Sequence, residues 1–506
     1  MFNFKNIFLA ALATVAVLLT PSCESGEPVG TPEEEQPVEI NLYFSDPIVT
    51  MPAEGGWYDI TISTNAETIE FINAISWVEV EQTSNNTISV YASENTSNSS
   101  RKGDILVVAT AGKSVKERAI TIEQVASGGT TAGGNLTFEC PVFEELVLTS
   151  FDTNGDGVLS ANEAAIVTEL DVTLDETSEE EQEAITSLKG IKNFVNLKYL
   201  YCAGNLITSL DVSGMEQLEY IECDYNKITK IDASGCKSLK WLYFNMNNVT
   251  TVLIEGCDNL MFFQGWKNNL TTIDLSNKPE MVYLDIRMNS LRDIKFENCP
   301  KLQVAALGSN NLISLNLKGL PSLYTLGCYD NNIATLDVSE LPNLQMLECY
   351  TNNIATLDLS ANKELVTLSC QNNLISELNL GDNTKLKKIE CANNRLTGEV
   401  DYSKYTALET LSCGGNNFTT INVNGCKALK SLSCENTNIT ALEVSALTAL
   451  ETLVANDCLI SVMDCSNNLK LTKLHLQGNP LTSLVLANGQ SIYDLKVDNY
   501  DVISYK

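Results

Sequence analysis

An asparagine recurs every 21 residues through the C-terminal part of this 506-residue chain. It belongs to a motif of the form LxxLxCxxNxIxxLDVS, of which residues 197–213 are a clear copy. A unit this short cannot bury its own apolar side chains, so the units must stack as a solenoid. After one step of 22 residues near Gly398, the register continues and gives about fifteen turns. The repeating position holds Asn205, Asn226, Asn247, Asn268, Asn289, Asn310, Asn331, Asn352, Asn373, Asn394, Asn416, Thr437, Cys458, Asn479 and Tyr500.

The spacing within one unit predicts its conformation. The LxC segment, such as residues 200–202, is expected to form one short strand of a parallel sheet on the concave side. The asparagine side chain is expected to satisfy backbone groups at the bend. The motif resembles internalin-like leucine-rich repeats. That resemblance implies an α/β-type leucine-rich repeat solenoid over residues 197–506 that recognises a ligand and catalyses nothing.

The 16 cysteines suggest a disulfide framework until their positions are considered. Half of them occupy the inward position three residues before the repeating asparagine, where Leu307 stands in another turn. Neighbours in this series lie near disulfide distance, but their side chains run parallel and are poorly angled for a bridge. We therefore predict free thiols that act as small apolar core residues. The series is Cys202, Cys223, Cys328, Cys349, Cys370, Cys391, Cys413 and Cys434.

Side chains that flank the inward leucine and cysteine are expected to point away from the core, onto the concave face. In the first turns these positions are rich in aromatic residues, with acidic and amide groups between them. Such a surface suits protein or sugar ligands; alternatively, the rings stack on one another as structural ladders. The candidate ligand-binding residues are Tyr199, Tyr201, Tyr220, Glu222, Trp241, Tyr243, Phe262, Trp266, Tyr283, Tyr329 and Tyr350.

Residues 152–163 read DTNGDGVLSANE and match the calcium loop of an EF-hand. Gly157 stands where the loop needs a sharp turn, and oxygen donors stand at the ligand positions. Sensor EF-hands and dockerins carry paired loops and this chain shows one, so we expect a single structural Ca²⁺ site. It would lie in an EF-hand-like cap over residues 137–196. The predicted ligands are Asp152, Asn154, Asp156, Val158 (through its carbonyl), Ser160 and Glu163.

Residues 40–126 alternate apolar and polar positions over short stretches separated by turn signals, which predicts an all-β, immunoglobulin-like sandwich. The stretch resembles the BACON domain through Gly55-Gly56, Ser76-Trp77-Val78, residues 101–105 and Ile122-Glu123-Gln124. That family is associated with carbohydrate binding. We expect Trp77 to be a core residue, which leaves Trp57 and Tyr58 as the other aromatic pair that could stack on a sugar. We prefer the interpretation that this domain is a spacer.

The N-terminus predicts export. Residues 1–22 contain Lys5 and then a short apolar run that ends before Cys23, which resembles a lipoprotein signal peptide with Cys23 as the lipidated residue. An ordinary signal peptide is the alternative. Residues 23–39 form an acidic, proline-rich tether, and residues 127–136 a glycine-rich linker. The acidic residues after Cys23 resemble those of Bacteroidetes-type surface lipoproteins, which implies an outer-membrane lipoprotein exposed on the cell surface and held in the membrane by its lipid alone.

Charge narrows the function further. The net charge is −32, and no basic stripe appears, which argues against nucleic-acid binding. The single histidine, His475, argues against histidine-based catalysis and multi-histidine metal centres. Carboxylates such as Glu222 and Asp224 have no accompanying base or nucleophile, so we expect no enzyme. The leading hypothesis is an adhesin or receptor that binds a protein on the N-terminal half of the concave face. A glycan-capture protein, acting through the BACON-like domain or the aromatic residues, is the alternative.

Overall fold

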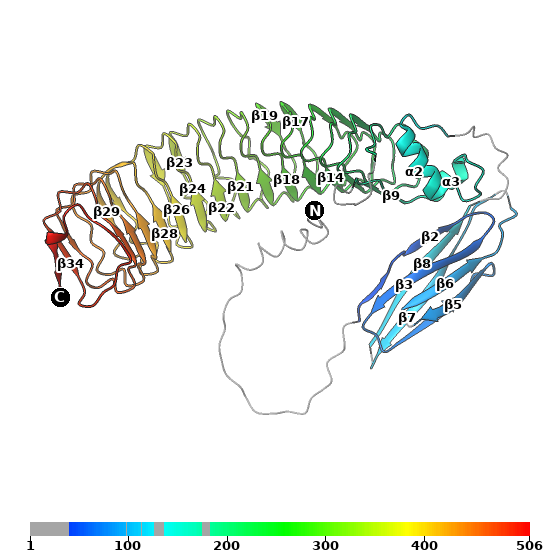
Figure 1. Ribbon diagram of the computed structural model, residues 1–506, viewed down its shortest axis with the longest axis horizontal. Coiled ribbons are helices and arrows are strands. Elements are labelled where there is room, and N and C mark those ends of the chain that lie inside the picture. Colours follow the sequence, from blue (N-terminus) through cyan, green and yellow to red (C-terminus); the bar gives the residue numbers. More distant parts are fainter. Residues whose placement is uncertain (1–39, 85, 98, 113, 126–135, 175–182) are drawn as a thin grey trace. The chain divides into compact units, whose positions relative to one another are not determined.

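The computed structural model describes residues 40–84, 86–97, 99–112, 114–125, 136–174 and 183–506 (Figure 1). These residues fall into two compact units. The first contains the described residues up to Thr168, together with those of Leu174–Glu183 and Lys189–Leu197. The second contains Glu169–Thr173, Ala184–Leu188 and Lys198–Lys506. Each unit is considered by itself below.

The first unit begins with two four-stranded sheets over its described residues. Their strands pair antiparallel, except that β2 and β8 are parallel. One sheet has the order β1 (Leu42–Phe44), β3 (Gly56–Thr64), β6 (Thr87–Ala92) and β5 (Val78–Ser84). The other has the order β2 (Ile48–Met51), β8 (Ser114–Gln124), β7 (Arg101–Ala111) and β4 (Thr68–Asn73).

Alternation along these strands places one apolar set in a common core. Ile60, Ile88, Ile105 and Ile120 come from different strands and are all fully buried. Trp77 packs against this core, as expected, and the Arg101 guanidinium lies 4.4 Å from its ring centre.

Two short helices follow in the same unit. Helix α2 (Pro141–Phe151) begins with a proline, which has no N–H to leave unpaired at a helix start. Helix α3 (Ala161–Ile166) begins with a capping box, in which Ser160 and Glu163 each accept a hydrogen bond from the other's backbone N–H. This helix is short, because the chain becomes extended at Val167. The unit ends with the 3₁₀ turn η2 (Ile191–Asn193).

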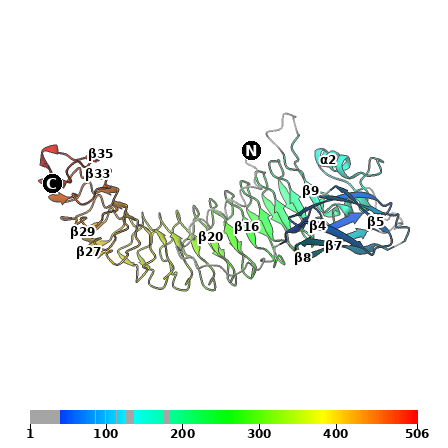
Figure 2. The ribbon, with the colours of Figure 1, turned by 90° about the horizontal axis from the view of Figure 1, so that it is seen from below.

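The second unit is a solenoid. Over its described residues, sixteen three-residue strands form one parallel sheet, and Figure 2 shows them side by side along the curved array. The strands are β9 (Glu169–Asp171), β10 (Tyr199–Tyr201), β12 (Tyr220–Glu222), β14 (Trp241–Tyr243), β16 (Phe262–Gln264), β18 (Tyr283–Asp285), β20 (Val304–Ala306), β21 (Thr325–Gly327), β22 (Met346–Glu348), β24 (Thr367–Ser369), β26 (Lys388–Glu390), β28 (Thr410–Ser412), β30 (Ser431–Ser433), β31 (Thr452–Val454), β33 (Lys473–His475) and β35 (Asp494–Lys496).

Shorter parallel sheets lie on the opposite side of the array (Figure 1). They are β11 (Ser209–Asp211), β13 (Lys230–Asp232) and β15 (Thr251–Leu253); β17 (Thr272–Asp274) and β19 (Asp293–Lys295); β23 (Thr356–Asp358) and β25 (Glu377–Asn379); β27 (Thr397–Asp401) and β29 (Asn417–Asn422); and β32 (Val462–Asp464), β34 (Ser483–Leu486) and β36 (Ile503–Tyr505), with the 3₁₀ turn η3 (Tyr500–Val502) before β36.

Two details of the predicted register are wrong. The sheet begins at β9 and not at residue 197, because Tyr199–Tyr201 pairs in register with Glu169–Asp171. At the other end, Tyr500 does not occupy the ladder position. It lies in η3, is 58% exposed and donates its hydroxyl hydrogen bond to the Leu495 carbonyl.

The predicted series of inward cysteines is confirmed. All eight are fully buried free thiols, since each lies between the sheet and the opposite side of its turn. Burial raises the pKa of Cys328 to about 12 and that of Cys391 to about 11. These thiols therefore stay protonated at neutral pH and fill the core as apolar groups.

Candidate functional site

The sixteen-stranded sheet presents three parallel rows of outward side chains, here called the sheet face. From β9 to β33 the middle residue of each strand is buried, so its first and third residues and the residue two positions further on point outward. Because neighbouring strands pair in register, equivalent residues of successive turns lie side by side. In the turns of β10 to β18 the first row is Tyr199, Tyr220, Trp241, Phe262 and Tyr283; the second is Tyr201, Glu222, Tyr243, Gln264 and Asp285; and the third is Ala203, Asp224, Asn245, Trp266 and Arg287.

The aromatic residues at these positions contact one another. Trp241 stacks on Phe262 and Phe262 on Tyr283, with ring centres 6.4 and 6.2 Å apart. The ring centre of Tyr220 lies 5.0 Å from that of Tyr201 and 6.2 Å from that of Trp241. The rings therefore form a ladder, as the alternative interpretation expects, and they are still only half-buried. Tyr199 and Trp266 occupy the same face of the sheet, in the first and third rows.

Carboxylates lie among the first of these rings. Tyr220 donates a hydrogen bond of 2.7 Å to Glu222, and burial, with the nearby charge of Asp171, raises the pKa of Glu222. Asp224 is 6% exposed and accepts hydrogen bonds from the backbone and side-chain N–H groups of Asn245. Burial, with the charge of Glu222, raises the pKa of Asp224 to about 7. At this end of the sheet face, two carboxylates are therefore shielded from water beside aromatic rings.

A second group lies further along the sheet. Tyr329 and Tyr350 stack almost face to face, with ring centres 4.6 Å apart and planes inclined by 4°. Arg287 forms two hydrogen bonds, of 2.9 and 2.6 Å, with Asp285. Those bonds raise the pKa of Arg287, and the nearby Tyr329 raises it further. The sequence interpretation missed Arg287, although the spacing Asp-x-Arg on one strand face is a signal for such a pair.

The predicted calcium loop joins α2 to α3. The Asp152 carboxylate accepts hydrogen bonds of 2.8 Å from the N–H groups of Gly155 and Gly157, which holds the loop in a tight turn. Glu163 accepts hydrogen bonds from Thr153 and Ser160, which lower its pKa although burial opposes the shift.

The donor set of this loop consists of oxygen atoms, which is the chemistry that Ca²⁺ prefers. Within the described residues, however, no three acidic, histidine or cysteine side chains form a group close enough to hold a metal ion. Ca²⁺ binding at this loop therefore stays a prediction.

The sandwich has an aromatic pair on its outer surface, but it is not the predicted one. Trp57 is 59% exposed and its ring lies 5.1 Å from that of Tyr91, its partner across β3 and β6. Tyr58, the expected partner, is adjacent to Trp57 in β3, and adjacent residues of a strand point to opposite faces.

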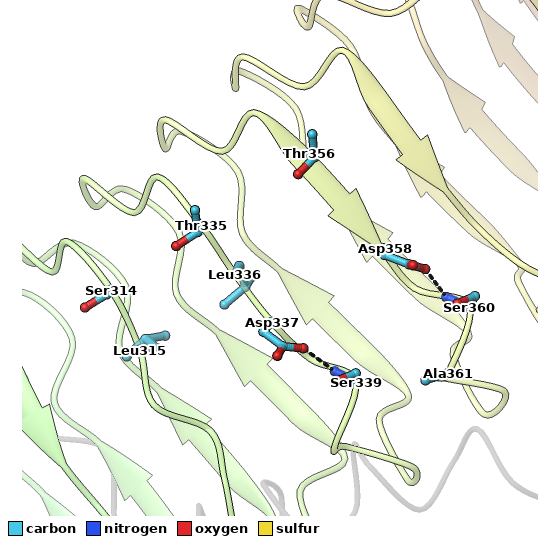
Figure 3. Close-up of a pocket in the computed structure, with 10 residues that line it drawn as sticks. All are labelled: Ser314, Leu315, Thr335, Leu336, Asp337, Ser339, Thr356, Asp358, Ser360 and Ala361. Atoms are coloured by element: carbon cyan, nitrogen blue, oxygen red, sulfur yellow. Dashed lines mark hydrogen bonds between the residues drawn. The ribbon is translucent and has the colours of Figure 1, made fainter.

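A shallow hollow of about 370 Å³ lies on the side of the shorter sheets, near β23 (Figure 3). Asp337 and Asp358 line it and accept hydrogen bonds of 3.0 and 2.9 Å from the backbone N–H groups of Ser339 and Ser360. These bonds lower the pKa of both carboxyls. The two carboxylates are thus used to shape successive bends of the chain.

The predicted leader, Cys23 and the acidic tether lie outside the described residues, as does nearly all of the glycine-rich linker. Among the residues that are described, none of the helices has the length and apolar character that crossing a membrane requires.

Comparisons with known proteins identify the fold. No family model and no curated protein matches the chain. The functional domain of InlJ from Listeria monocytogenes, which includes a cysteine ladder, is 25% identical, with a TM-score of 0.53 over 69% of this chain and 80% of that chain. PEPR1, solved as PEPR1–AtPEP1, is 16% identical, with a TM-score of 0.52 over 69% of this chain and 57% of its own. YopM from Yersinia pestis is 20% identical, with a TM-score of 0.49 over 60% and 83%. The solenoid of about fifteen turns matches a leucine-rich repeat fold, and its sheet is similar in structure to the InlJ domain.

Proposed function

We propose that this chain is a non-catalytic recognition lipoprotein of the cell surface, held in the outer membrane through Cys23, that binds a protein ligand on the N-terminal half of the sheet face. The observation that carries the proposal is the set of half-buried aromatic residues in the turns of β10 to β18, with carboxylates between them. Aromatic side chains that are held in place by their neighbours lose little entropy on binding, which suits them to protein interfaces.

The comparisons add support from related solenoids. One neighbour with the same cysteine ladder is described as the functional domain of InlJ, and another, PEPR1, was solved with AtPEP1. A solenoid of this kind offers a long sheet face on which a ligand contacts several turns at once. The sandwich would then act as an immunoglobulin-like, BACON-related spacer, and the loop at residues 152–163 as a structural Ca²⁺ site.

The experiment uses residues 24–506, which lack the leader and the lipid. A phage library of random twelve-residue peptides is selected on the immobilised protein, and the protein is applied in parallel to a glycan array. The test variant is Tyr220→Ala/Trp241→Ala/Phe262→Ala in the first row. The matched control is Thr367→Ala/Thr410→Ala/Thr452→Ala, which alters the same row in C-terminal turns.

We expect enriched peptides that bind the protein and the threonine variant, lose at least tenfold in affinity for the aromatic variant, and have no counterpart among the glycans. Peptides that bind the aromatic variant equally well would place the interaction elsewhere and contradict the proposal. A glycan bound by the protein and lost in the aromatic variant would replace the protein ligand with a sugar.

A second candidate, glycan binding by the sandwich, is favoured by the Trp57–Tyr91 pair. The exposed Trp57 ring stands beside Asp59 and Ser89, two polar residues that are hydrogen-bonded to each other. An aromatic platform with polar groups at its edge is suited to a sugar ring. On the same glycan array, this candidate predicts binding that Trp57→Ala abolishes and that the first-row aromatic variant leaves unchanged.

A further inference from the structure

The sheet face contains one basic residue whose surroundings show how a cation is held there. Arg287, in the third row, forms two hydrogen bonds with Asp285, in the second row of the same turn, and the Asp285 side chain is only 4% exposed. Tyr329 lies close enough to the same guanidinium to raise its pKa. This site combines a buried carboxylate, an aromatic residue and a basic side chain.

Three turns earlier, the same two rows hold Glu222 and Asp224, so a second carboxylate takes the place of the arginine. In the described part of the chain, no lysine or arginine forms an ion pair with Glu222, Asp224 or the neighbouring Asp171. Lys240, whose charge acts on Tyr199, is already paired with Glu219 at 2.6 Å. These carboxylates therefore lack the basic partner that Asp285 has.

Aromatic rings complete the surroundings of Glu222. The ring centre of Tyr220 lies 5.0 Å from that of Tyr201 and 5.5 Å from that of Tyr243. The Tyr220 hydroxyl donates a hydrogen bond to Glu222 and so fixes the position of the carboxylate. Ring faces attract cations, most strongly where water is excluded. We call Tyr201, Tyr220, Glu222, Asp224 and Tyr243 the acidic tyrosine patch.

An unsatisfied polar atom lies in this patch. Tyr243 is 7% exposed, and its hydroxyl has no hydrogen-bond partner among the residues that the structure describes. After burial, the charges that act most strongly on that hydroxyl, and raise its pKa, are those of Glu222 and Asp224. A buried hydroxyl without a partner destabilises the fold, and a donor or acceptor from a ligand would remove that cost.

We infer that the acidic tyrosine patch binds a basic side chain, lysine or arginine, of the protein ligand. The inference rests on the proposed function and names the chemistry of its partner. The ligand's ammonium or guanidinium group donates to Glu222 and lies against the tyrosine rings, while Asp224 and Asp171 add negative charge. The bound cation repeats at this turn the arrangement that Arg287 makes with Asp285.

The test uses the peptides selected from the twelve-residue library. The first variant is Glu222→Gln/Asp224→Asn. Its matched control, Glu390→Gln/Glu435→Gln, removes two carboxylates from the same rows in C-terminal turns, and binding is measured at pH 8, where Asp224 is mostly ionised, so that the two proteins have nearly the same net charge. Each selected peptide is also made with its recurrent lysine or arginine replaced by methionine.

The expected result is a lysine or arginine that recurs at one peptide position, with at least a tenfold loss of affinity from Glu222→Gln/Asp224→Asn or from the methionine substitution, and less than a twofold loss from the control. If both double variants weaken binding equally, attraction to the overall charge explains the result and the inference is wrong. Peptides that depend on Tyr220, Trp241 and Phe262 but contain no recurrent basic residue would overturn the inference and leave the proposed function standing.

The variant Glu222→Gln alone keeps the experiment decisive if the double variant does not fold. Glutamine retains an oxygen that accepts the hydrogen bond from Tyr220 and removes only the charge. We expect it to weaken binding of the basic peptide at least fivefold and to leave binding of its methionine version unchanged. Equal effects on the two peptides would contradict a role for the Glu222 charge.

Discussion

The side-chain amide of Asn352 donates a hydrogen bond of 3.0 Å to the carbonyl of Cys328, 24 residues earlier in the chain. Its oxygen accepts one of 2.9 Å from the N–H of Ile333. One side chain thus satisfies buried backbone groups of the preceding turn, and the same two bonds recur at Asn226 and Asn373. The ladder of asparagines is therefore a set of connections between successive turns.

Asn352→Ala is expected to lower stability by about 2 kcal/mol, because it leaves the buried N–H of Ile333 without its partner and removes one of the two side-chain hydrogen bonds that the Cys328 carbonyl accepts. The neighbouring Asn353 is exposed and takes part through its backbone only, so Asn353→Ala should change stability by less than about 0.5 kcal/mol. Urea unfolding and hydrogen exchange over residues 328–352 measure both effects. Equal effects of the two substitutions would show that the asparagine ladder does not contribute to the stability of the folded protein.

Position 265 has room only for glycine, because the ring of Phe244, which is fully buried in the preceding turn, lies against it. A Cβ at Gly265 would lie 2.1 Å from Phe244 Cζ, so Gly265→Ala is expected to cost about 1–3 kcal/mol. Gly308 is the matched comparison, since a Cβ there would lie 2.4 Å from Tyr329 Cζ, but the Tyr329 ring is half-exposed and able to move. Gly308→Ala should therefore lower the melting temperature less. The opposite order would contradict this account.

Calcium is expected to stabilise the first unit through the loop at residues 152–163. Ca²⁺ at a hundred times its dissociation constant would add about 2.7 kcal/mol, seen as a higher melting temperature that a chelator reverses. Glu163→Gln removes one charged ligand and keeps an oxygen for the hydrogen bonds of Thr153. This variant should lose the response to Ca²⁺. A wild-type melting temperature that ignores both Ca²⁺ and chelator would show that the loop does not bind the ion.

The cysteines of the ladder are expected to resist alkylation in the folded protein. Burial raises the pKa of Cys328 to about 12, so almost no thiolate exists at pH 8, and the thiols are also inaccessible. Iodoacetamide followed by peptide mass spectrometry should label none of the eight before unfolding and all of them after it. A residue that stays unlabelled in denaturant would indicate a disulfide.

Binding of a basic peptide is expected to strengthen as the pH rises from 6 to 8. The pKa of Asp224 is about 7 in the free protein, and a bound cation favours its ionised form, so affinity falls by up to about tenfold at pH 6. Asp224 faces Glu222 from its own turn, Tyr243 and Asn245 from the next, and the Cys223 thiol. Titrations at fixed ionic strength measure the slope of peptide affinity against pH, and Glu222→Gln/Asp224→Asn should reduce that slope. An unchanged slope in that variant would assign the pH dependence to another group.

The sequence by itself determined the solenoid. A 21-residue period in leucine, cysteine and asparagine allows few arrangements, because each inward position must meet its equivalent in the next turn, as Leu200 meets Ile221. The same period identified the row of aromatic residues and the inward thiols. Local spacing also predicted the strands of the sandwich, since alternation has a direct physical meaning.

The tertiary structure decided how neighbouring side chains pair. The partners of Trp57 and of Asp285 depend on register and rotamer, which no spacing reveals. The same is true of Glu222, which has no basic partner within the described residues. The bend before each ladder asparagine shows the same limit. Residues as different as Tyr225, Met246 and Thr351 adopt positive φ there, between 54° and 55°, although such residues disfavour it. Local conformational preference predicts a negative φ at these positions. The hydrogen bonds between stacked turns outweigh that preference, and the sequence of one turn does not reveal them because they form only once the neighbouring turn is in place.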